Sequence, residues 1–151
     1  MIWLGIDPGT TVSGWALYHN RVDGVVLDSG VADNKELLYG LNDMGADRLA
    51  LEIMVASYSK SPVGKEVFET VRFTGRLQQA WASPDDVVLV PRGDVRVYLC
   101  GTAKSGDPHV RQALIDRLGA PGTKAAKGPT YGVKSHAWAA LGVAVTAAGR
   151  P

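Results

Sequence analysis

The first eleven residues constrain the fold of this chain more than any later segment. The apolar run Met1–Ile6 ends in one acidic residue, Asp7, and Pro8-Gly9 then turns the chain at once. The segment 13–18 is apolar again and is typical of a second strand. Asp7 is therefore expected at the end of a buried strand, where an unpaired carboxylate is costly. Such a carboxylate either meets a cation or a donor, or caps the following turn through its own side chain.

The rest of the chain predicts an α/β fold with a mixed five-stranded sheet and helices on both faces. Strand-like apolar runs are followed by helical spacing and by turn residues that separate the segments. The expected strands are 1–7, 13–18, 25–31, 48–55 and 87–90, and the expected helices are 34–41, 65–81, 108–118 and 135–148. Asn34 and Asp107 are expected as helix N-caps. Pro91-Arg92-Gly93 is interpreted as the turn that ends the fifth strand, and Cys100 as a core residue.

Length and composition predict one domain over residues 1–151. No run approaches the roughly 18 apolar residues of a membrane span, and the first residues do not resemble a signal peptide. The lone Cys100 fits a reducing cytoplasm, where we expect the protein to be located. The net charge of +1 conceals an asymmetry: residues 1–90 carry 7 basic and 12 acidic side chains (−5), and residues 91–151 carry 9 and 3 (+6). A polyanion such as nucleic acid would favour the second half; a chance clustering of surface charges is the alternative.

The segment Gly5-Ile-Asp-Pro-Gly-Thr-Thr-Val-Ser-Gly-Trp-Ala-Leu-Tyr18 resembles the first hairpin of the RuvC-type Holliday-junction resolvases, members of the ribonuclease H-like superfamily. In that family the Asp of this motif binds catalytic magnesium, a role that the resemblance implies for Asp7. Sugar kinases, actin-like ATPases and a bacterial rRNA-processing nuclease family begin similarly, so other positions must distinguish these classes.

Two later segments extend the resemblance. Glu52 stands inside the apolar run 49–55, and a strand with a central Glu carries the family's second metal ligand; a buried Glu paired with a basic side chain is the alternative. The segment 133–146 resembles the final helix, and His136 stands where the family has an acidic residue or, in some members, a histidine. Three positions later Ala139 replaces an expected Asp, which leaves three candidate ligands, Asp7, Glu52 and His136, and puts a second metal in doubt.

Candidate DNA contacts come from basic residues in the second half and from one aromatic residue after the Glu52 strand. Segment 101–114 resembles the region before the family's basic DNA-facing helix, and the loop 119–132 is long enough to be functional. An aromatic ring in a loop can stack on an unpaired base, or it can be an ordinary loop residue. The candidates are Lys104, Arg111, Lys124, Lys127, Lys134 and Tyr58.

The resemblance implies a metal-dependent endonuclease, using Mg²⁺ or Mn²⁺, that cuts Holliday junctions and related branched DNA as a homodimer. The helix 65–81 is the expected dimer face, although its aromatic residues Phe68, Phe73 and Trp81 are equally compatible with a core. Segment 61–68 and the ending 131–138 look most like the phage-encoded branch, which would place the protein in the host cytoplasm. Alternatives are a junction-binding protein with weak or no catalysis and a nuclease acting on structured RNA. An actin-like ATPase would need two lobes and a longer chain.

Overall fold

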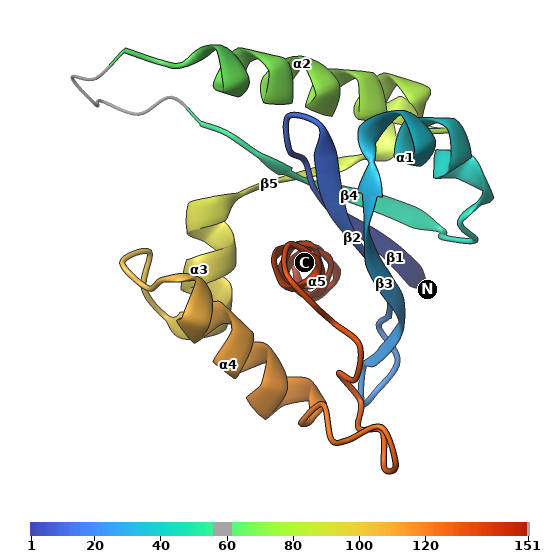
Figure 1. Cartoon of the computed structure of the whole chain (residues 1–151), viewed down its shortest axis with the longest axis vertical. Helices are drawn as coiled ribbons and strands as arrows, with labels where there is room; N and C mark the ends of the chain where they lie inside the picture. The colour runs from blue at the N-terminus through green and yellow to red at the C-terminus, as the bar shows by residue number, and fades with distance from the viewer. Residues whose placement is uncertain (56–61, 151) are drawn as a thin grey trace.

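The computed structural model describes residues 1–55 and 62–150 and is built on a five-stranded mixed sheet (Figure 1). The strands lie in the order β3-β2-β1-β4-β5. Antiparallel pairs join β1 to β2 and β2 to β3, and parallel pairs join β1 to β4 and β4 to β5. The bounds are β1 (Ile2–Asp7), β2 (Val12–His19), β3 (Val25–Asp33), β4 (Arg48–Ile53) and β5 (Val88–Pro91). All five predicted strands are therefore present.

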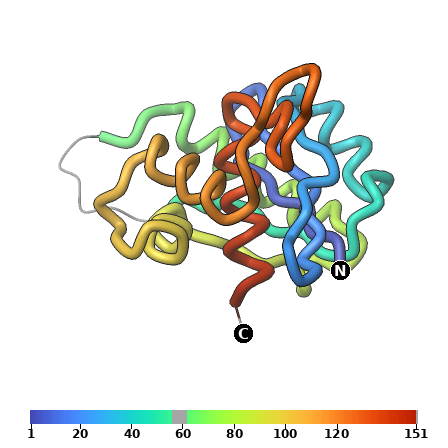
Figure 2. Tube along the Cα trace, turned by 90° about the horizontal axis from the view of Figure 1, so that it is seen from below, coloured from blue at the N-terminus to red at the C-terminus, as the bar shows by residue number. Residues whose placement is uncertain are grey.

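Helices cover both faces of the sheet, as the sequence predicted. They are α1 (Asn34–Gly40), α2 (Lys65–Ala80), α3 (Arg92–Cys100), α4 (Asp107–Leu118) and α5 (Ala137–Gly149), with short 3-10 turns at Leu41–Asp43 and Pro84–Asp86. On one face α1 and α2 bury leucines of β1 and β4, and on the other α5 lies between the sheet and the α3–α4 pair (Figures 1 and 2). No helix within residues 1–55 and 62–150 is both long and apolar enough to cross a bilayer.

Helix α5 lies at the centre of its layer, and almost every one of its residues is buried. A helix that is apolar all round needs partners on every side, and α5 finds them in β1, β2, α3 and α4. Two glycines let it approach the sheet closely. A Cβ atom at Gly5 would overlap the carbonyl oxygen of Ala140, and one at Gly14 would overlap the carbonyl oxygen of His136. These glycines set the depth at which α5 sits.

Helix α3 was not predicted, and the interpretation of Pro91-Arg92-Gly93 as a simple turn was wrong. Pro91 has extended backbone angles and is the N-cap, so its missing N–H costs the helix nothing. The helix ends at Gly101, whose φ of 80° is the left-handed conformation common at this position. Cys100, in its last turn, is half-buried against the core, in line with the core placement expected for it.

The turn after Asp7 is held by one side chain from β2 and one from the start of α1. The Ser13 hydroxyl accepts from the Gly9 N–H at 3.1 Å and donates to Asn34 Oδ1 at 2.7 Å, and Asn34 Nδ2 donates to the Gly9 carbonyl at 2.9 Å. Asn34 is thus a buried bracing residue, and the predicted cap role falls to Asp33, which accepts from the Lys35 N–H at 2.9 Å. Asp7 is left free for other partners.

One further expectation about helices needs correction, and the structure chooses between the two placements considered for the aromatic residues of the helix 65–81. Asp107 is the first residue of α4, and Gly106 is the N-cap. In α2, Phe73 and Trp81 belong to the core beneath the helix, whereas Phe68 is 62% exposed. Of the three aromatic residues considered for a dimer face, only Phe68 lies on the surface.

Candidate active site

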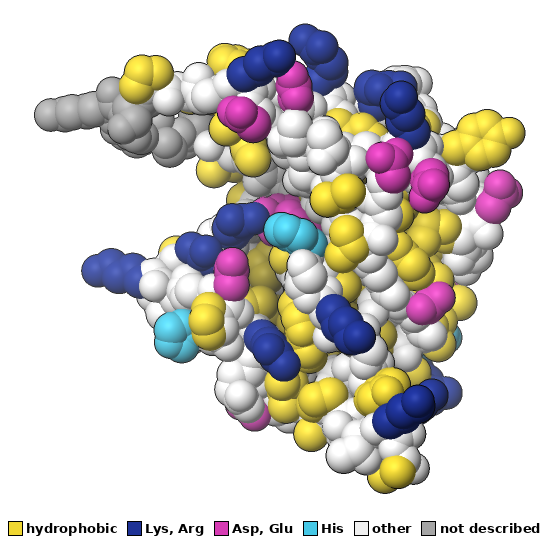
Figure 3. Space-filling model, viewed as in Figure 1, with side chains coloured by type: hydrophobic (Ala, Val, Ile, Leu, Met, Phe, Trp, Pro, Cys, Tyr) yellow, Lys and Arg dark blue, Asp and Glu magenta, His cyan; other side chains and the backbone are white. Residues whose placement is uncertain are grey.

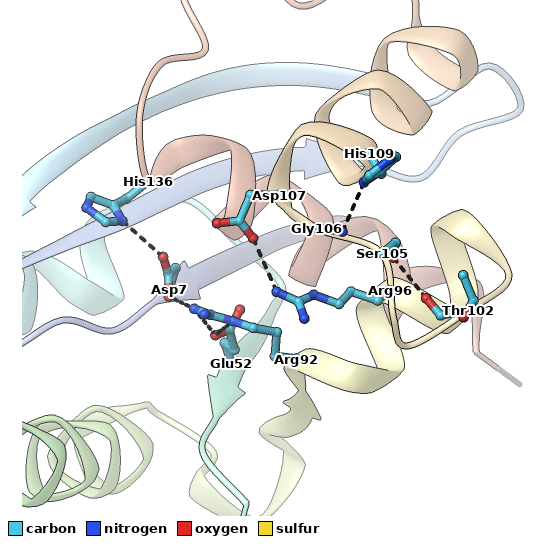
Figure 4. A network of polar contacts seen from close by, with 10 residues as sticks. All are labelled: Asp7, Glu52, Arg92, Arg96, Thr102, Ser105, Gly106, Asp107, His109 and His136. Carbon is cyan, nitrogen blue, oxygen red and sulfur yellow. Dashed lines mark hydrogen bonds and ion pairs between the residues drawn. The ribbon is translucent and has the colours of Figure 1, made fainter.

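Asp7 and Glu52 lie side by side at the carboxyl ends of two adjacent parallel strands. Ile6 pairs with Leu51 across β1 and β4, so the next residues along each strand are neighbours. Because side chains alternate along a strand and Ile6 and Leu51 face α2, the two carboxylates point to the opposite face. There they meet the start of α5 and the start of α3 (Figure 4).

The carboxylates line a cavity of about 300 Å³. His136, directly before α5, lines the same cavity, together with Ala139 one turn further on. In the space-filling view an indentation lies between α2 and the α3–α4 side, with basic, acidic and histidine side chains gathered at its inner end (Figure 3). The structure therefore brings together the three residues that the sequence predicted for the site.

Arg92, the first residue of α3, binds both carboxylates. Its Nε and Nη2 lie 2.9 Å and 2.8 Å from Glu52 Oε1, and Nη2 lies 3.9 Å from Asp7 Oδ1. Both acidic side chains are nearly buried, with 9% and 11% of their surface exposed, whereas that of Arg92 is 52% exposed. The guanidinium thus closes the pair from the solvent side of the cavity.

Burial dominates the electrostatics of both acids. Loss of hydration raises the pKa of Asp7 above its ordinary value, and the nearby charges of Arg92 and His136 only partly lower it again. Burial likewise raises the pKa of Glu52; the Asp7 charge raises it further, and Arg92 opposes both effects. Asp107 adds a smaller increase to each. A pair whose negative charge is costly to bury is suited to meeting a cation.

His136 contacts Asp7 from the other side of the cavity. Its Nδ1 lies 3.4 Å from Asp7 Oδ2, and its ring is 63% exposed. The backbone around it is tightly held, because Gly14 lies against the His136 carbonyl and Ser135 before it adopts a left-handed φ of 50°. A non-glycine residue in that region is uncommon and indicates a conformation imposed by its surroundings.

The donor set fits a hard divalent cation held by few protein ligands. Within the part of the chain that the structure describes, no three His, Cys, Asp or Glu side chains are close enough together to form a metal-binding group. Mg²⁺ commonly binds through one or two carboxylates and completes its shell with water and substrate phosphate. The oxygens of Asp7 and Glu52 meet that requirement. His136 lies beside this pair, with its Nδ1 in contact with Asp7 Oδ2.

The predicted DNA contacts fall in three places. Arg111 and Lys134 line a groove that adjoins the cavity and shares Asp107, Ser135 and Trp138 with it. Arg111 lies 5.1 Å from the centre of the Trp138 ring. Lys104 is exposed in the turn between α3 and α4.

The other candidates lie further along the chain. Lys124 and Lys127 are exposed in the loop before α5, and Lys127 lies 5.2 Å from the centre of the Tyr131 ring. Tyr58 lies outside the described residues.

Sequence reasoning missed three charged residues of the cavity: Arg92, Arg96 and Asp107. Arg96 Nη2 pairs with Asp107 Oδ1 at 3.6 Å, so the second arginine of α3 has an acid of its own. One signal could have found Arg92. It follows β5 directly, and β5 runs parallel to β4, so its carboxyl end must lie at the same edge of the sheet as Glu52.

Two solved structures resemble the chain over nearly its whole length. Thermus thermophilus RuvC superposes with a TM-score of 0.71 at 19% sequence identity, covering 97% of this chain and 92% of that one. T. thermophilus RuvC in complex with a Holliday junction substrate gives a TM-score of 0.69 at 20% identity, with the same shares covered. The sequence matches no family profile and no curated protein.

The sheet order, the helices on both faces and the comparisons define a ribonuclease H-like fold. Within that class, the arrangement of elements is similar to that of T. thermophilus RuvC, in line with the resemblance of the first hairpin. A fold alone does not establish an activity, so the function is argued from the site. The placement in a phage-encoded branch stays a prediction.

Proposed function

We propose that this protein is a metal-dependent endonuclease that resolves Holliday junctions and related branched DNA by symmetric phosphodiester cleavage. The observation that carries the proposal is the pair of nearly buried carboxylates, Asp7 and Glu52, which face one cavity from adjacent parallel strands. The RuvC-like fold supports it, as does the T. thermophilus protein of that fold, which is described in complex with a Holliday junction substrate.

Asp7 and Glu52 would hold a Mg²⁺ or Mn²⁺ ion through their oxygens. When bound, the ion supplies Lewis-acid polarisation of the scissile phosphate and lowers the pKa of attacking water. His136 either completes the ligand set or handles a proton. In the second role its Nδ1 faces Asp7 Oδ2, which orients the ring and leaves Nε2 to exchange the proton.

The DNA would follow the groove beside the cavity. Arg111 and Lys134 lie on its walls, and Trp138 forms part of the surface shared with the cavity. Arginine and lysine side chains beside an active site position the DNA backbone through contacts with its phosphates, and such contacts do not depend on the DNA sequence. Three further exposed lysines would add positive charge to the DNA-binding surface. Lys104 precedes the groove residue Arg111 in the sequence, and Lys124 and Lys127 precede Lys134.

Two symmetric cuts require two active sites, so we propose a two-fold homodimer. Exposed apolar side chains on α2, Phe68 at 62% and Val71 at 49%, are compatible with an interface on that helix. The oligomeric state is measured by light scattering of the purified protein, where a monomer at micromolar concentration would contradict this part of the proposal.

One cleavage experiment tests the activity. Purified protein is incubated with labelled four-way, Y-shaped and linear DNA, and with a matching four-way RNA, with and without Mg²⁺ or Mn²⁺. We expect paired nicks in the four-way DNA only with metal. Asp7→Asn and Glu52→Gln should each reduce cleavage by about 10²-fold or more, the range for losing one main electrostatic group, while junction binding persists or tightens.

The matched control is Asp33→Asn, which alters a helix cap on α1 and leaves the site untouched. Cleavage by both site variants at the wild-type rate would contradict the assignment. Binding without cleavage by the wild-type protein would favour the junction-binding alternative, and preferential cutting of the RNA would favour the structured-RNA nuclease.

A further inference from the structure

Arg92 occupies the place between the carboxylates where a cation is required, although nothing in the sequence motif assigns it a role. We propose that Arg92 is a resident counterion that a divalent cation displaces from Glu52, and that the released guanidinium then binds a phosphate of the nucleic acid. The inference rests on the proposed function and deepens it by adding a residue to the same site.

The contacts show why the two cations compete. Arg92 Nε donates a hydrogen bond to Glu52 Oε1 at 2.9 Å, Nη2 forms an ion pair with the same oxygen at 2.8 Å, and Nη2 also lies 3.9 Å from Asp7 Oδ1. A Mg²⁺ ion binds carboxylate oxygen at about 2.0–2.1 Å. An ion on Glu52 would therefore bring a double positive charge within a few ångströms of the guanidinium. Like charges a few ångströms apart repel each other strongly in a partly buried site, because little water is present to screen them.

Arg92 also has somewhere to go. Its side chain is 52% exposed and lines the open cavity, so release from Glu52 does not require the core to open. The planar guanidinium matches phosphate oxygens with two parallel N–H donors. In the metal-free state the same group offsets one of the two negative charges of the carboxylate pair, which would otherwise repel the DNA backbone more strongly.

Arg96 provides the contrast within the same helix. It lines the same cavity one turn further along α3, but it pairs with Asp107, whose side chain is 84% exposed, at 3.6 Å. It makes no recorded contact with Asp7 or Glu52 in residues 1–55 and 62–150. Arg96→Ala is therefore a matched control that removes an arginine from the cavity without removing the competitor.

The first test is Mn²⁺ binding in the absence of nucleic acid, measured by isothermal titration calorimetry on the wild type, Arg92→Ala, Arg92→Gln and Arg96→Ala. We expect Arg92→Ala and Arg92→Gln to bind Mn²⁺ about tenfold more tightly than the wild type, and Arg96→Ala to match it. Arg92→Gln retains a side chain of similar shape and keeps the test valid if the alanine variant does not fold. Unchanged or weaker Mn²⁺ binding by the folded Arg92 variant would overturn the proposal.

The second test measures the coupling between metal and phosphate. Junction affinity is compared with Ca²⁺ and with EDTA, using Ca²⁺ as an oxygen-liganded probe ion. If the metal releases Arg92, the gain in affinity caused by Ca²⁺ should be several-fold larger in the wild type than in Arg92→Gln. An equal gain in both proteins would refute the phosphate-binding step.

The two proposals fail in different ways. Tighter Mn²⁺ binding by the Arg92 variants, in a protein that cleaves no branched DNA, would support the exchange and reject the nuclease. Cleavage of junctions by a wild type whose Mn²⁺ affinity does not respond to Arg92 would support the nuclease and reject the exchange.

Discussion

Gly14 and His136 are in direct backbone contact: the position of a Cβ on Gly14 is already occupied by the carbonyl group of His136. Gly14 is in β2, next to Asp7 in β1, and His136 precedes α5. The missing side chain of one residue therefore determines how closely the imidazole of the other approaches the carboxylate, 3.4 Å in this structure.

Gly14→Ala should move His136 away from Asp7. Overpacking of a tightly packed site lowers the free energy of unfolding by about 1–3 kcal/mol. At a temperature where the variant is still folded, cleavage should nevertheless fall, because the contact between His136 and Asp7 is lost. Urea unfolding and cleavage kinetics at 25 °C measure the two effects.

The control for Gly14→Ala is Gly40→Ala, at the end of α1 and outside the cavity lining. Among the described residues, no atom beyond its chain neighbours and its own helix backbone lies within 4 Å of a Cβ at Gly40, whose φ is −90°, and alanine in a helix is favoured over glycine by about 0.5–1 kcal/mol. That variant should be at least as stable as the wild type and fully active. A Gly14→Ala protein with wild-type stability and activity would show that α5 can shift without consequence.

The buried carboxylates predict an unusual pH dependence of stability in the metal-free protein. Burial raises the pKa of Asp7 in the folded state above its ordinary value of 3.8. At a pH between 3.8 and this raised pKa, the folded state therefore binds more protons than the unfolded state. The free energy of unfolding should therefore fall as pH rises above about 3.8 and reach its lower level above the folded-state pKa.

Asp7→Asn removes this penalty, and in EDTA at neutral pH it should be more stable than the wild type. The difference should disappear as the pH falls below 3.8, because Asp7 is then protonated in both states. Chemical denaturation at a series of pH values checks this, with Asp23→Asn in the exposed β2–β3 turn as control. An Asp7→Asn variant that is less stable than the wild type at neutral pH would show that the ionised Asp7 stabilises the metal-free fold, contrary to this prediction.

The salt dependence of junction binding should identify the DNA face. Lys104→Ala and Arg111→Ala should each reduce the slope of log affinity against log salt by about one unit, the expectation for one phosphate contact. Arg21→Ala, in the exposed β2–β3 turn, serves as the control. Fluorescence anisotropy at several salt concentrations provides the slopes, and site variants with the wild-type slope would place the DNA on another surface.

Ala139 offers a way to add a metal ligand. It lines the cavity with His136, and residues three apart on a helix are neighbours. Ala139→Asp should strengthen Mg²⁺ binding, because hard Mg²⁺ prefers oxygen ligands. In the wild type, whose third candidate ligand is an imidazole, we expect Mn²⁺ to support faster cleavage than Mg²⁺.

Calorimetry with both ions and cleavage rates measure these preferences. Ala82→Asp, at an exposed position just after α2 and outside the cavity, controls for the added charge. Full activity of His136→Ala in both metals would remove His136 from the site.

Asp7 and Glu52 could be singled out in the sequence because each conflicts with its local surroundings, whereas His136 was predicted from the resemblance alone. Asp7 and Glu52 are carboxylates inside apolar strand patterns, and a parallel pairing of those strands necessarily places them together. Ser13 and Asn34 were not readable as the braces of the first turn, because their hydrogen bonds join residues 21 and 25 positions apart.

Arg92 was missed for a related reason. Its role depends on α3 beginning directly after β5, and Pro91 and Gly93 on either side of it are typical of a turn. The sequence also did not show which aromatic residues of the helix 65–81 are buried. Helical spacing cannot tell that Phe73 and Trp81 cover β1 and β4 while Phe68 faces outward. Both features are decided by packing between distant segments.

The central position of α5 has a consequence for the biosynthesis of the protein. Residues 7, 52 and 136 come from the first strand, the middle of the chain and the last helix, and the sheet face beneath α5 has no cover until residues 137–149 are present. A nascent chain still on the ribosome therefore lacks both its imidazole and the core that holds its carboxylates in place. A chain that stops before residue 137 therefore has no assembled cavity, however complete its sheet is.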